Sequence, residues 1–270
     1  MKLDFLLITA TDLEQEPVRT RMEISGTDHP IARPWRLGTL CGKSVLLIEG
    51  GVGQVNTAAA LTLALTRHDP AVILQFGVGG AYVRSGLGAG DLAVATEECY
   101  GDTGVLTPKG WMDLEGMGFP IIPARTGRTG AQGQAGQAGQ AGQAGQTPRK
   151  PLYNRIPLDA RRTEHIRRCL EAGLESRSSY QVAFGPFVTV QQCSGIQAVG
   201  DTLAARYGGV CENMEGAAAA HIAEANGIPF VEIRGISNRV VDRDLSQWDL
   251  PLAIRRCQQA VELIVESGVC

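Results

Sequence analysis

Short apolar segments alternate with helix-like segments along most of the chain. The apolar segments show little of the in–out alternation of a half-exposed strand, and they end in polar residues or glycine. We expect strands at residues 3–9, 45–49, 72–76, 91–96, 187–190 and 230–234. Runs rich in helix-forming residues predict helices at 56–68, 217–226 and 252–266, the last capped by Asp249. The alternation predicts an α/β fold of three layers, one domain over residues 1–270, in which helices cover both faces of a mostly parallel sheet.

Residues 126–150 break this pattern with back-to-back Gly-Gln-Ala repeats. The repeats have almost nothing to bury, so no burial offsets the conformational entropy that ordering would cost. Strand and helix patterns resume after them. We therefore expect a disordered surface loop inserted into the domain.

Composition and charge narrow the class of partner. Apolar residues make up 44% of 270, which is enough for a real core, and the net charge of −3 lacks the basic footprint of a nucleic-acid binder. No apolar run reaches the roughly 18 residues that span a bilayer. The N-terminus begins like a signal peptide, but Asp4 precedes its apolar run and no small-residue cleavage site follows, so we interpret it as a buried first strand. The seven scattered cysteines, without a C-x-x-C pair, indicate free thiols in a reducing cytoplasm and no metal site.

Glycines and polar residues gather where the predicted strands end. They lie at residues 9–14, 50–53, 77–80 and 237–238. In parallel sheets, ligands bind beyond the carboxyl ends of the strands, so these segments predict a pocket floored by backbone. Tight turns explain the glycines equally well. A dinucleotide fingerprint is disfavoured, because Asn56 stands where a third glycine is required.

Two acidic residues are the candidates for chemistry. Glu14 follows the first strand, and Glu215 precedes an alanine-rich helix. A carboxylate beside such an apolar helix is costly unless it is paired, and the two hydroxyls of a ribose can pair with it. Favourable placement at a helix N-terminus is the alternative for both acids.

The most specific segments are residues 212–221 (ENMEGAAAAH) and 234–238 (RGISN). Together with the glycine segments at 50–53 and 77–80, they resemble the superfamily of purine nucleoside phosphorylases and nucleosidases over nearly the whole chain outside the repeats. Within it, residues 187–190, 236–238 and 246–249 resemble the futalosine hydrolases, which cleave hypoxanthine from an inosine derivative in menaquinone biosynthesis. The resemblance implies a mixed, mostly parallel sheet and a nucleosidase that needs no metal or organic cofactor.

The resemblance also implies residue roles. Glu215 would bind the ribose hydroxyls, and Glu14 would be the base that activates water, with Glu16 as the alternative register. The remaining implied contacts with the nucleoside are Met214 under the sugar, Ser237 and Asn238 facing the purine, Val52 and Gly79 lining the pocket, and the stretch from Val190 to Ile196 over the base.

Asn238 discriminates between leaving groups. Adenine-specific relatives carry Asp at the matching position. An amide has one acceptor and two donors, so Asn238 can donate to O6 of hypoxanthine and accept from a protonated N7, whereas adenine would present a donor to a donor. A buried mispaired group is costly, which favours a 6-oxopurine. Asn238 cannot itself supply the N7 proton.

Three alternatives remain for the function. Phosphorolysis would need arginines on the glycine segments, which carry none, although Arg84 lies just beyond. An adenine-cleaving thioether nucleosidase is disfavoured by Asn238, and a non-catalytic purine-binding protein by the presence of both Glu14 and Glu215.

For the 5′ substituent the sequence leaves three candidate arginines, Arg125, Arg155 and Arg239. Relatives are commonly homodimers or larger, so we expect a homo-oligomer.

Overall fold

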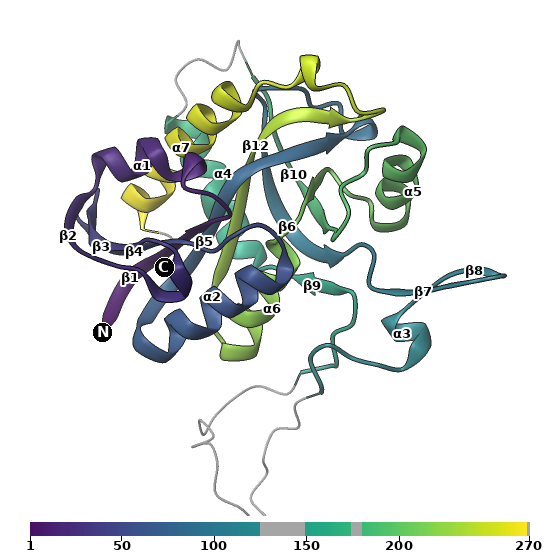
Figure 1. The fold of residues 1–270 in the computed structure, drawn as a ribbon, viewed down its shortest axis with the longest axis horizontal. Helices are drawn as coiled ribbons and strands as arrows, with labels where there is room; N and C mark the ends of the chain where they lie inside the picture. The colour runs from purple at the N-terminus through teal and green to yellow at the C-terminus, as the bar shows by residue number, and fades with distance from the viewer. Residues whose placement is uncertain (125–148, 174–179, 269–270) are drawn as a thin grey trace, which may run out of the picture. The chain divides into compact units, whose positions relative to one another are not determined.

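The computed structural model describes residues 1–124, 149–173 and 180–268. Contacts divide the chain into two compact units, one formed by residues 1–102 with 155–270 and the other by residues 103–154. The first unit carries the α/β fold that the sequence predicts (Figure 1). The second was not predicted as a separate unit. The predicted insertion at 126–150 lies within it and, apart from residues 149 and 150, falls outside the described residues.

A mixed sheet is the centre of the first unit. Its strand order is β11-β10-β6-β12-β5-β1-β4-β3-β2, with β9 paired to β6. The strands are β1 (Lys2–Thr9), β2 (Glu23–Asp28), β3 (Trp35–Leu40), β4 (Lys43–Glu49), β5 (Asp69–Tyr82), β6 (Leu92–Tyr100), β9 (Arg155–Pro157), β10 (Val182–Thr189), β11 (Cys211–Asn213) and β12 (Phe230–Val240). The pairs of β1 with β4 and β5, of β12 with β5, and of β10 with β6 and β11 are parallel. β11 also pairs antiparallel with β5, so five strands close on themselves at one end of the sheet.

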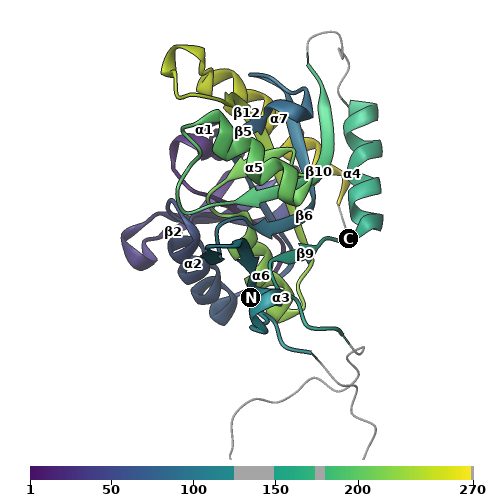
Figure 2. The same ribbon diagram turned by 90° about the vertical axis from the view of Figure 1, so that its right-hand side faces the viewer.

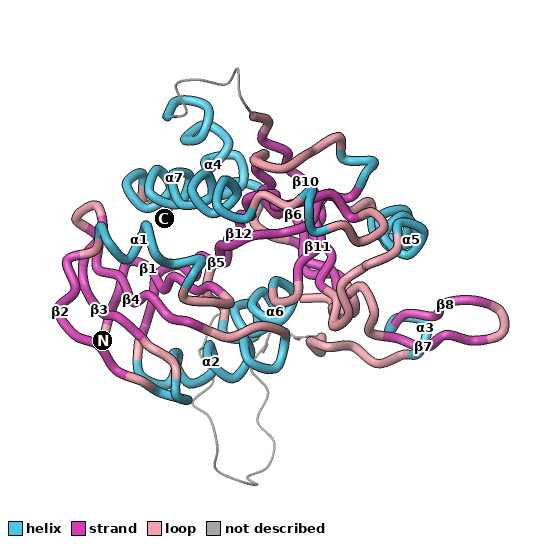
Figure 3. Tube along the Cα trace, turned by 45° about the horizontal axis from the view of Figure 1, so that its top comes forward, coloured by secondary structure: helices cyan, strands magenta, loops and turns pink. Residues whose placement is uncertain are grey.

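Helices cover both faces of this sheet, as expected (Figure 3). The α-helices of the first unit are α1 (Glu16–Arg21), α2 (Gln54–Arg67), α4 (Ala160–Gly173), α5 (Gln197–Tyr207), α6 (Gly216–Asn226) and α7 (Leu250–Ser267). Helices α4 and α7 lie on one face, and α2 and α6 lie together on the other. Figure 2 shows α4 alongside β10, where the Arg167 guanidinium lies 3.8 Å from the centroid of the Phe184 ring. None of the described helices is long and apolar enough to cross a membrane.

Sequence pattern and packing agree in the central strands. Phe5 and Leu7 of β1 point towards the core under α7, where they meet Val261 and Ile264. Leu6 and Ile8, of opposite parity, are buried as well, because a parallel sheet covered on both faces has no solvent side. Helix α7 begins as predicted, since Asp249 accepts a hydrogen bond from the backbone N–H of Leu252.

The glycine segment at 77–80 is not the loop that the sequence suggested. Strand β5 continues through it, and β12 likewise continues through Ser237 and Asn238. Glycine-rich segments form weak strands, but β5 pairs here with β11 on one side and β12 on the other, which stabilises its extended backbone. These residues therefore contribute to the pocket from within the sheet.

The second unit, taken alone, contains a hairpin of β7 (Gly104–Thr107) and β8 (Gly110–Asp113), followed by the short helix α3 (Leu114–Met117). The Asn154 side chain ties its ends together. The amide accepts a hydrogen bond from the backbone N–H of Leu114 at 2.8 Å and donates one to the carbonyl of Thr103 at 2.7 Å.

Candidate active site

A cavity of about 320 Å³ opens beside the glycine-rich part of β5. Its wall is built by the segment after β1, the turn before α2, the junction of β11 with α6, and the later half of β12. The lining residues used below are Glu14, Val52, Gly79, Gly80, Ser194, Glu212, Asn213, Met214, Glu215, Arg234, Ser237, Asn238 and Arg243. The sequence-predicted residues Glu14, Glu215 and Asn238 thus meet in one cavity, although they are far apart in the chain.

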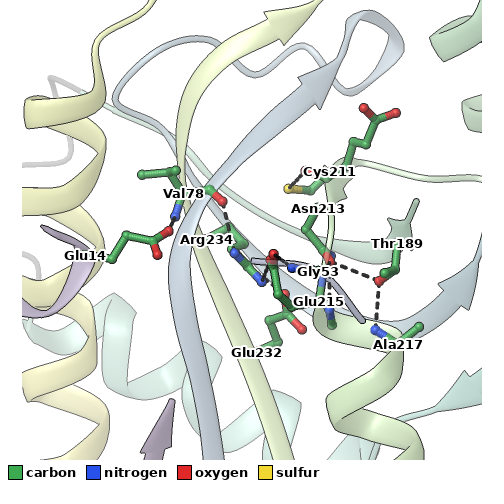
Figure 4. Close-up of polar contacts among 12 residues, drawn as sticks. Glu14, Gly53, Val78, Thr189, Cys211, Asn213, Glu215, Ala217, Glu232 and Arg234 are labelled. Atoms are coloured by element: carbon green, nitrogen blue, oxygen red, sulfur yellow. Dashed lines mark hydrogen bonds and ion pairs between the residues drawn. The ribbon is translucent and has the colours of Figure 1, made fainter. Parts of the chain in front are cut away.

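Glu14 is buried in a short 3-10 turn (Leu13–Gln15) after β1 and is 5% exposed. Its Oε1 accepts a hydrogen bond from the Val78 backbone N–H at 2.9 Å, and its Oε2 accepts from the backbone N–H and the hydroxyl of Thr11, both at 3.0 Å (Figure 4). Burial raises the pKa of Glu14, while Arg234 and these hydrogen bonds oppose the rise. Glu16, the alternative register, is exposed and faces a different depression.

Glycine at position 77 makes room for this carboxylate. A Cβ there would lie 2.3 Å from Oε1 of Glu14, closer than any real contact. The bare backbone of β5 thereby lets an acid from the neighbouring strand end approach the sheet. This close approach is the physical use of a glycine that, from sequence, looked like part of a turn.

Glu215 stands at the N-cap position of α6 and is 4% exposed. Its Oε1 accepts a hydrogen bond from the Gly53 backbone N–H at 2.9 Å, and its Oε2 accepts from Nη2 of Arg234 at 3.2 Å. Gly53 has φ 90°, a left-handed value that favours glycine, where it begins α2. The carboxylate therefore has fixed partners and two oxygens with remaining acceptor capacity toward the cavity.

Arg234 links Glu215 and Glu232, a role that its sequence context did not predict. It is 1% exposed in the middle of β12. Besides Glu215, its guanidinium donates from Nε to Glu232 at 2.7 Å and from Nη1 to the carbonyl of Val78 at 3.1 Å (Figure 4). Burial lowers the pKa of Arg234, but the adjacent carboxylates, Glu232 first, more than reverse this and keep the guanidinium charged.

A second buried acid pair lies behind Arg234. Glu98 on β6 and Glu232 on β12 are both fully buried. Burial first, and then the neighbouring Glu232, raise the pKa of Glu98 well above its ordinary value. Burial also raises the pKa of Glu232, but the adjacent Arg234 opposes that rise, so Glu98 is the acid of the pair that more readily holds a proton. A Cβ at position 216 would lie 2.3 Å from Oε2 of Glu232 and 2.5 Å from Oε2 of Glu98, so the first residue of α6 is fitted against this pair.

The turn that presents Glu215 is held by Asn213 and Thr189. The side-chain oxygen of Asn213 accepts from the backbone N–H of Glu215 at 2.9 Å and of Gly216 at 2.8 Å. The Thr189 hydroxyl donates to the same oxygen at 3.0 Å and accepts from the Ala217 N–H at 2.7 Å. These bonds satisfy the free N–H groups at the start of α6 and fix the direction of Glu215.

The other end of the cavity is formed by amide and hydroxyl groups. The Asn238 oxygen accepts from the Ser237 hydroxyl at 2.8 Å, and its Nδ2 donates to the carbonyl of Arg239 at 2.9 Å. One N–H and one acceptor position of the amide stay available to a ligand. Met214 and Gly79 line the cavity, and Val52 is 50% exposed at its edge.

Two predicted contacts lie outside the lining. Val190 is buried in a cluster with Tyr82 and Leu203, and Ile196 is 59% exposed at the start of α5. From the same stretch, Cys193 and Ser194 line the cavity instead. Ser194 is anchored by Glu212, which accepts from its backbone N–H at 2.8 Å and its hydroxyl at 2.6 Å.

The two predicted arginines that the structure describes, Arg155 and Arg239, do not line this cavity. Arg155 pairs with Glu97 at 2.5 Å, Arg239 donates to the carbonyl of Leu87 at 3.0 Å, and Arg125 lies outside the described residues. Arg84 donates to the carbonyl of Ala204 at 3.1 Å. The cations that line the cavity, among the described residues, are Arg234 and the exposed Arg243, which stacks over Trp248 with 5.0 Å to the ring centroid.

Two futalosine hydrolases are similar to this chain over most of its length. The chain is 31% identical over 235 residues to futalosine hydrolase of Thermus thermophilus, covering 87% of this chain and 86% of that protein. It is 27% identical over 270 residues to futalosine hydrolase of Acidothermus cellulolyticus, covering 96% and 89%.

Solved structures share the fold. The 5′-methylthioadenosine/S-adenosylhomocysteine nucleosidase of Neisseria meningitidis, in complex with methylthio-immucillin-A, superposes with a TM-score of 0.75 at 22% identity, over 97% of this chain and 98% of that one. Futalosine hydrolase of Helicobacter pylori superposes with a TM-score of 0.73 at 16% identity, over 99% and 98%. A sequence model of the phosphorylase superfamily matches residues 4–266. The chain belongs to the phosphorylase superfamily.

Proposed function

We propose that this protein hydrolyses the N-glycosidic bond of futalosine and releases hypoxanthine and dehypoxanthine futalosine. The observation that carries the proposal is the convergence of two buried carboxylates, Glu14 and Glu215, and the amide of Asn238 on one cavity. The two relatives named futalosine hydrolase, which match most of the chain, support this substrate.

In the proposed mechanism Glu215 accepts hydrogen bonds from the ribose hydroxyls. The bond from the anomeric carbon to N9 breaks with its electron pair going to the base, and the sugar becomes oxocarbenium-like. Glu14 takes a proton from a water molecule, whose oxygen bonds to the anomeric carbon. The negative charges of Glu14 and Glu215 stabilise the cationic sugar. The departing hypoxanthine takes a proton from solvent, and Glu14 later returns to solvent the proton that it took from the attacking water. Asn238 contacts O6 and N7 of the base.

Water is favoured over phosphate by the charges around the reacting carbon. Three of the five N–H groups of Arg234 already donate, to Glu215, Glu232 and a backbone carbonyl, and its charge is shared with the two carboxylates. The carboxylates of Glu14 and Glu215 would repel a phosphate placed between them. The geometry therefore favours a nucleosidase over a phosphorylase.

We also propose that the protein acts as a homodimer or larger homo-oligomer in a reducing cytoplasm. Leu13 and Val52 leave 60% and 50% of their surface exposed at the cavity edge, where a partner copy could cover them. The six described cysteines are free thiols. Light scattering coupled to size-exclusion chromatography tests the assembly, and a monomer at assay concentration would contradict it.

Substrate choice is tested by measuring kcat/KM for futalosine, inosine and methylthioadenosine with chromatographic detection of the free base. We expect hypoxanthine from futalosine to be formed with the highest kcat/KM. Preferred release of adenine from methylthioadenosine would overturn the proposal.

A further inference from the structure

A third carboxylate, Glu212, lies across the sheet from Asn238. Gly80 of β5 pairs with Glu212 of β11 on one side and with Asn238 of β12 on the other. Directly paired residues of neighbouring strands point to the same face, and both side chains line the cavity. This arrangement exists because β11 closes onto β5. It places an acid and an amide on the two flanks of one glycine.

The glycine keeps the space between them open. A Cβ at position 80 would lie 2.9 Å from Cγ2 of Val240 and 3.5 Å from Nδ2 of Asn238. Strands are about 4.8 Å apart, so groups on either side of β5 are separated by roughly twice that distance at their backbones. Side chains reaching inward from both flanks can therefore contact neighbouring atoms on one edge of a purine.

Glu212 is presented as a hydrogen-bond acceptor. Its Oε1 accepts from the Ser194 N–H, and its Oε2 accepts from the hydroxyls of Ser194 and, at 3.0 Å, Tyr82. These three donors leave a carboxylate with about one of its four acceptor positions free. Glu212 forms no salt bridge with any described lysine or arginine. A buried acceptor of this kind, 6% exposed, is best satisfied by a donor from the ligand.

We propose that Glu212 is a specificity-determining residue that accepts a hydrogen bond from N1–H of a 6-oxopurine while Asn238 contacts O6 and N7. The inference rests on the proposed function and deepens it. Hypoxanthine carries a proton on N1, whereas adenine presents a lone pair there and would meet the carboxylate with like charge. The two residues together contact the three polar positions N1, O6 and N7 along one edge of the base, and each disfavours adenine at a different position.

A purely structural role for Glu212, anchoring Ser194, predicts a different outcome. In that case Glu212→Gln would slow all substrates in proportion. If Glu212 instead accepts the hydrogen bond from N1–H, Glu212→Gln gains an N–H that can donate to N1 of adenine. The ratio of kcat/KM for futalosine to kcat/KM for its 6-amino counterpart should then fall about 10- to 100-fold. The ratio is internal to each preparation, so a partly unfolded variant does not distort it.

The control variant is Tyr82→Phe, which removes one donor to Glu212 but leaves the carboxylate. It should keep the ratio within about threefold of wild type. Wild-type protein should also cleave futalosine methylated at N1 about 10- to 100-fold less efficiently than futalosine, which tests the contact even if Glu212→Gln does not fold.

An unchanged ratio in Glu212→Gln, or equal cleavage of the N1-methylated substrate, would overturn the inference while leaving the proposed function intact. Absence of hypoxanthine release by wild-type protein would instead refute the proposed function itself.

Discussion

Replacing Glu14 with Gln tests which acid activates water. The amide keeps the volume of the side chain but cannot take a proton. General-base catalysis contributes about 10²- to 10⁴-fold, so kcat/KM for futalosine should fall by that factor, equivalent to about 2.7–5.4 kcal/mol. The loss should lie mainly in kcat, because the contacts of Glu215 and Asn238 with the substrate remain.

The structure also sets the stability cost of this substitution. Both Glu14 oxygens accept hydrogen bonds, from Val78 on one side and Thr11 on the other. An amide offers one acceptor oxygen, so its NH2 would face a backbone N–H at a cost of about 1–3 kcal/mol. The Tm of the variant should therefore be measured by thermal unfolding, and the kinetic assays should be run well below that temperature.

Glu16→Gln is the matched control, because Glu16 is two residues away and exposed. It should keep kcat/KM within about twofold of wild type. Activity of Glu14→Gln within about tenfold of wild type, or a loss in Glu16→Gln as large as in Glu14→Gln, would refute the assignment of Glu14 as the base.

Three further predictions concern the buried acids. Because burial raises the pKa of Glu14 and the base must be ionised, kcat/KM should decline on an acid limb centred above the ordinary glutamic acid pKa of about 4.3; a limb at or below that value in a pH–rate profile would contradict this. The folded-state pKa of Glu98 is raised, so its contribution to stability is present below the unfolded pKa and is lost as the pH rises through the folded pKa. The Tm of Glu98→Gln relative to wild type should therefore increase between about pH 5 and about pH 8. A constant difference in Tm would show that Glu98 is not the protonated acid. Gly216→Ala should destabilise the protein by about 1–3 kcal/mol in chemical denaturation despite the better helix propensity of alanine, because its Cβ would collide with Glu98 and Glu232. Gly26→Ala is the control, because a Cβ at position 26 has no atom within 4 Å, and equal effects of the two substitutions would argue against the collision.

Much of the fold follows from local sequence patterns. Apolar runs predict the buried strands β1, β4 and β12, and runs of helix-forming residues predict the helices α2, α6 and α7. Strands β2, β3 and β11 do not, since β2 is exposed along its length and β11 has three residues. The closure of β11 onto β5 depends on pairing between distant segments, which no local pattern records.

The sequence predicts those site residues whose ionisable side chains stand at conspicuous positions along the chain. Glu14 and Glu215 stand out as acids beside strand ends and an apolar helix. The choice between Glu14 and Glu16 depends on the direction of one 3-10 turn, which the sequence leaves open. Arg234 was missed because it looked like one polar residue in a strand. Its signal was Glu232 two residues earlier, since residues of equal parity share a face and a buried arginine needs such a partner.

The central claim is hydrolysis, and the most direct measurement is the product balance in phosphate-free buffer. Wild-type protein incubated with futalosine should release hypoxanthine and dehypoxanthine futalosine in equal amounts, at a rate that added phosphate leaves unchanged. Hypoxanthine that forms only when phosphate is present, together with a sugar 1-phosphate, or no hypoxanthine at all, would contradict the account.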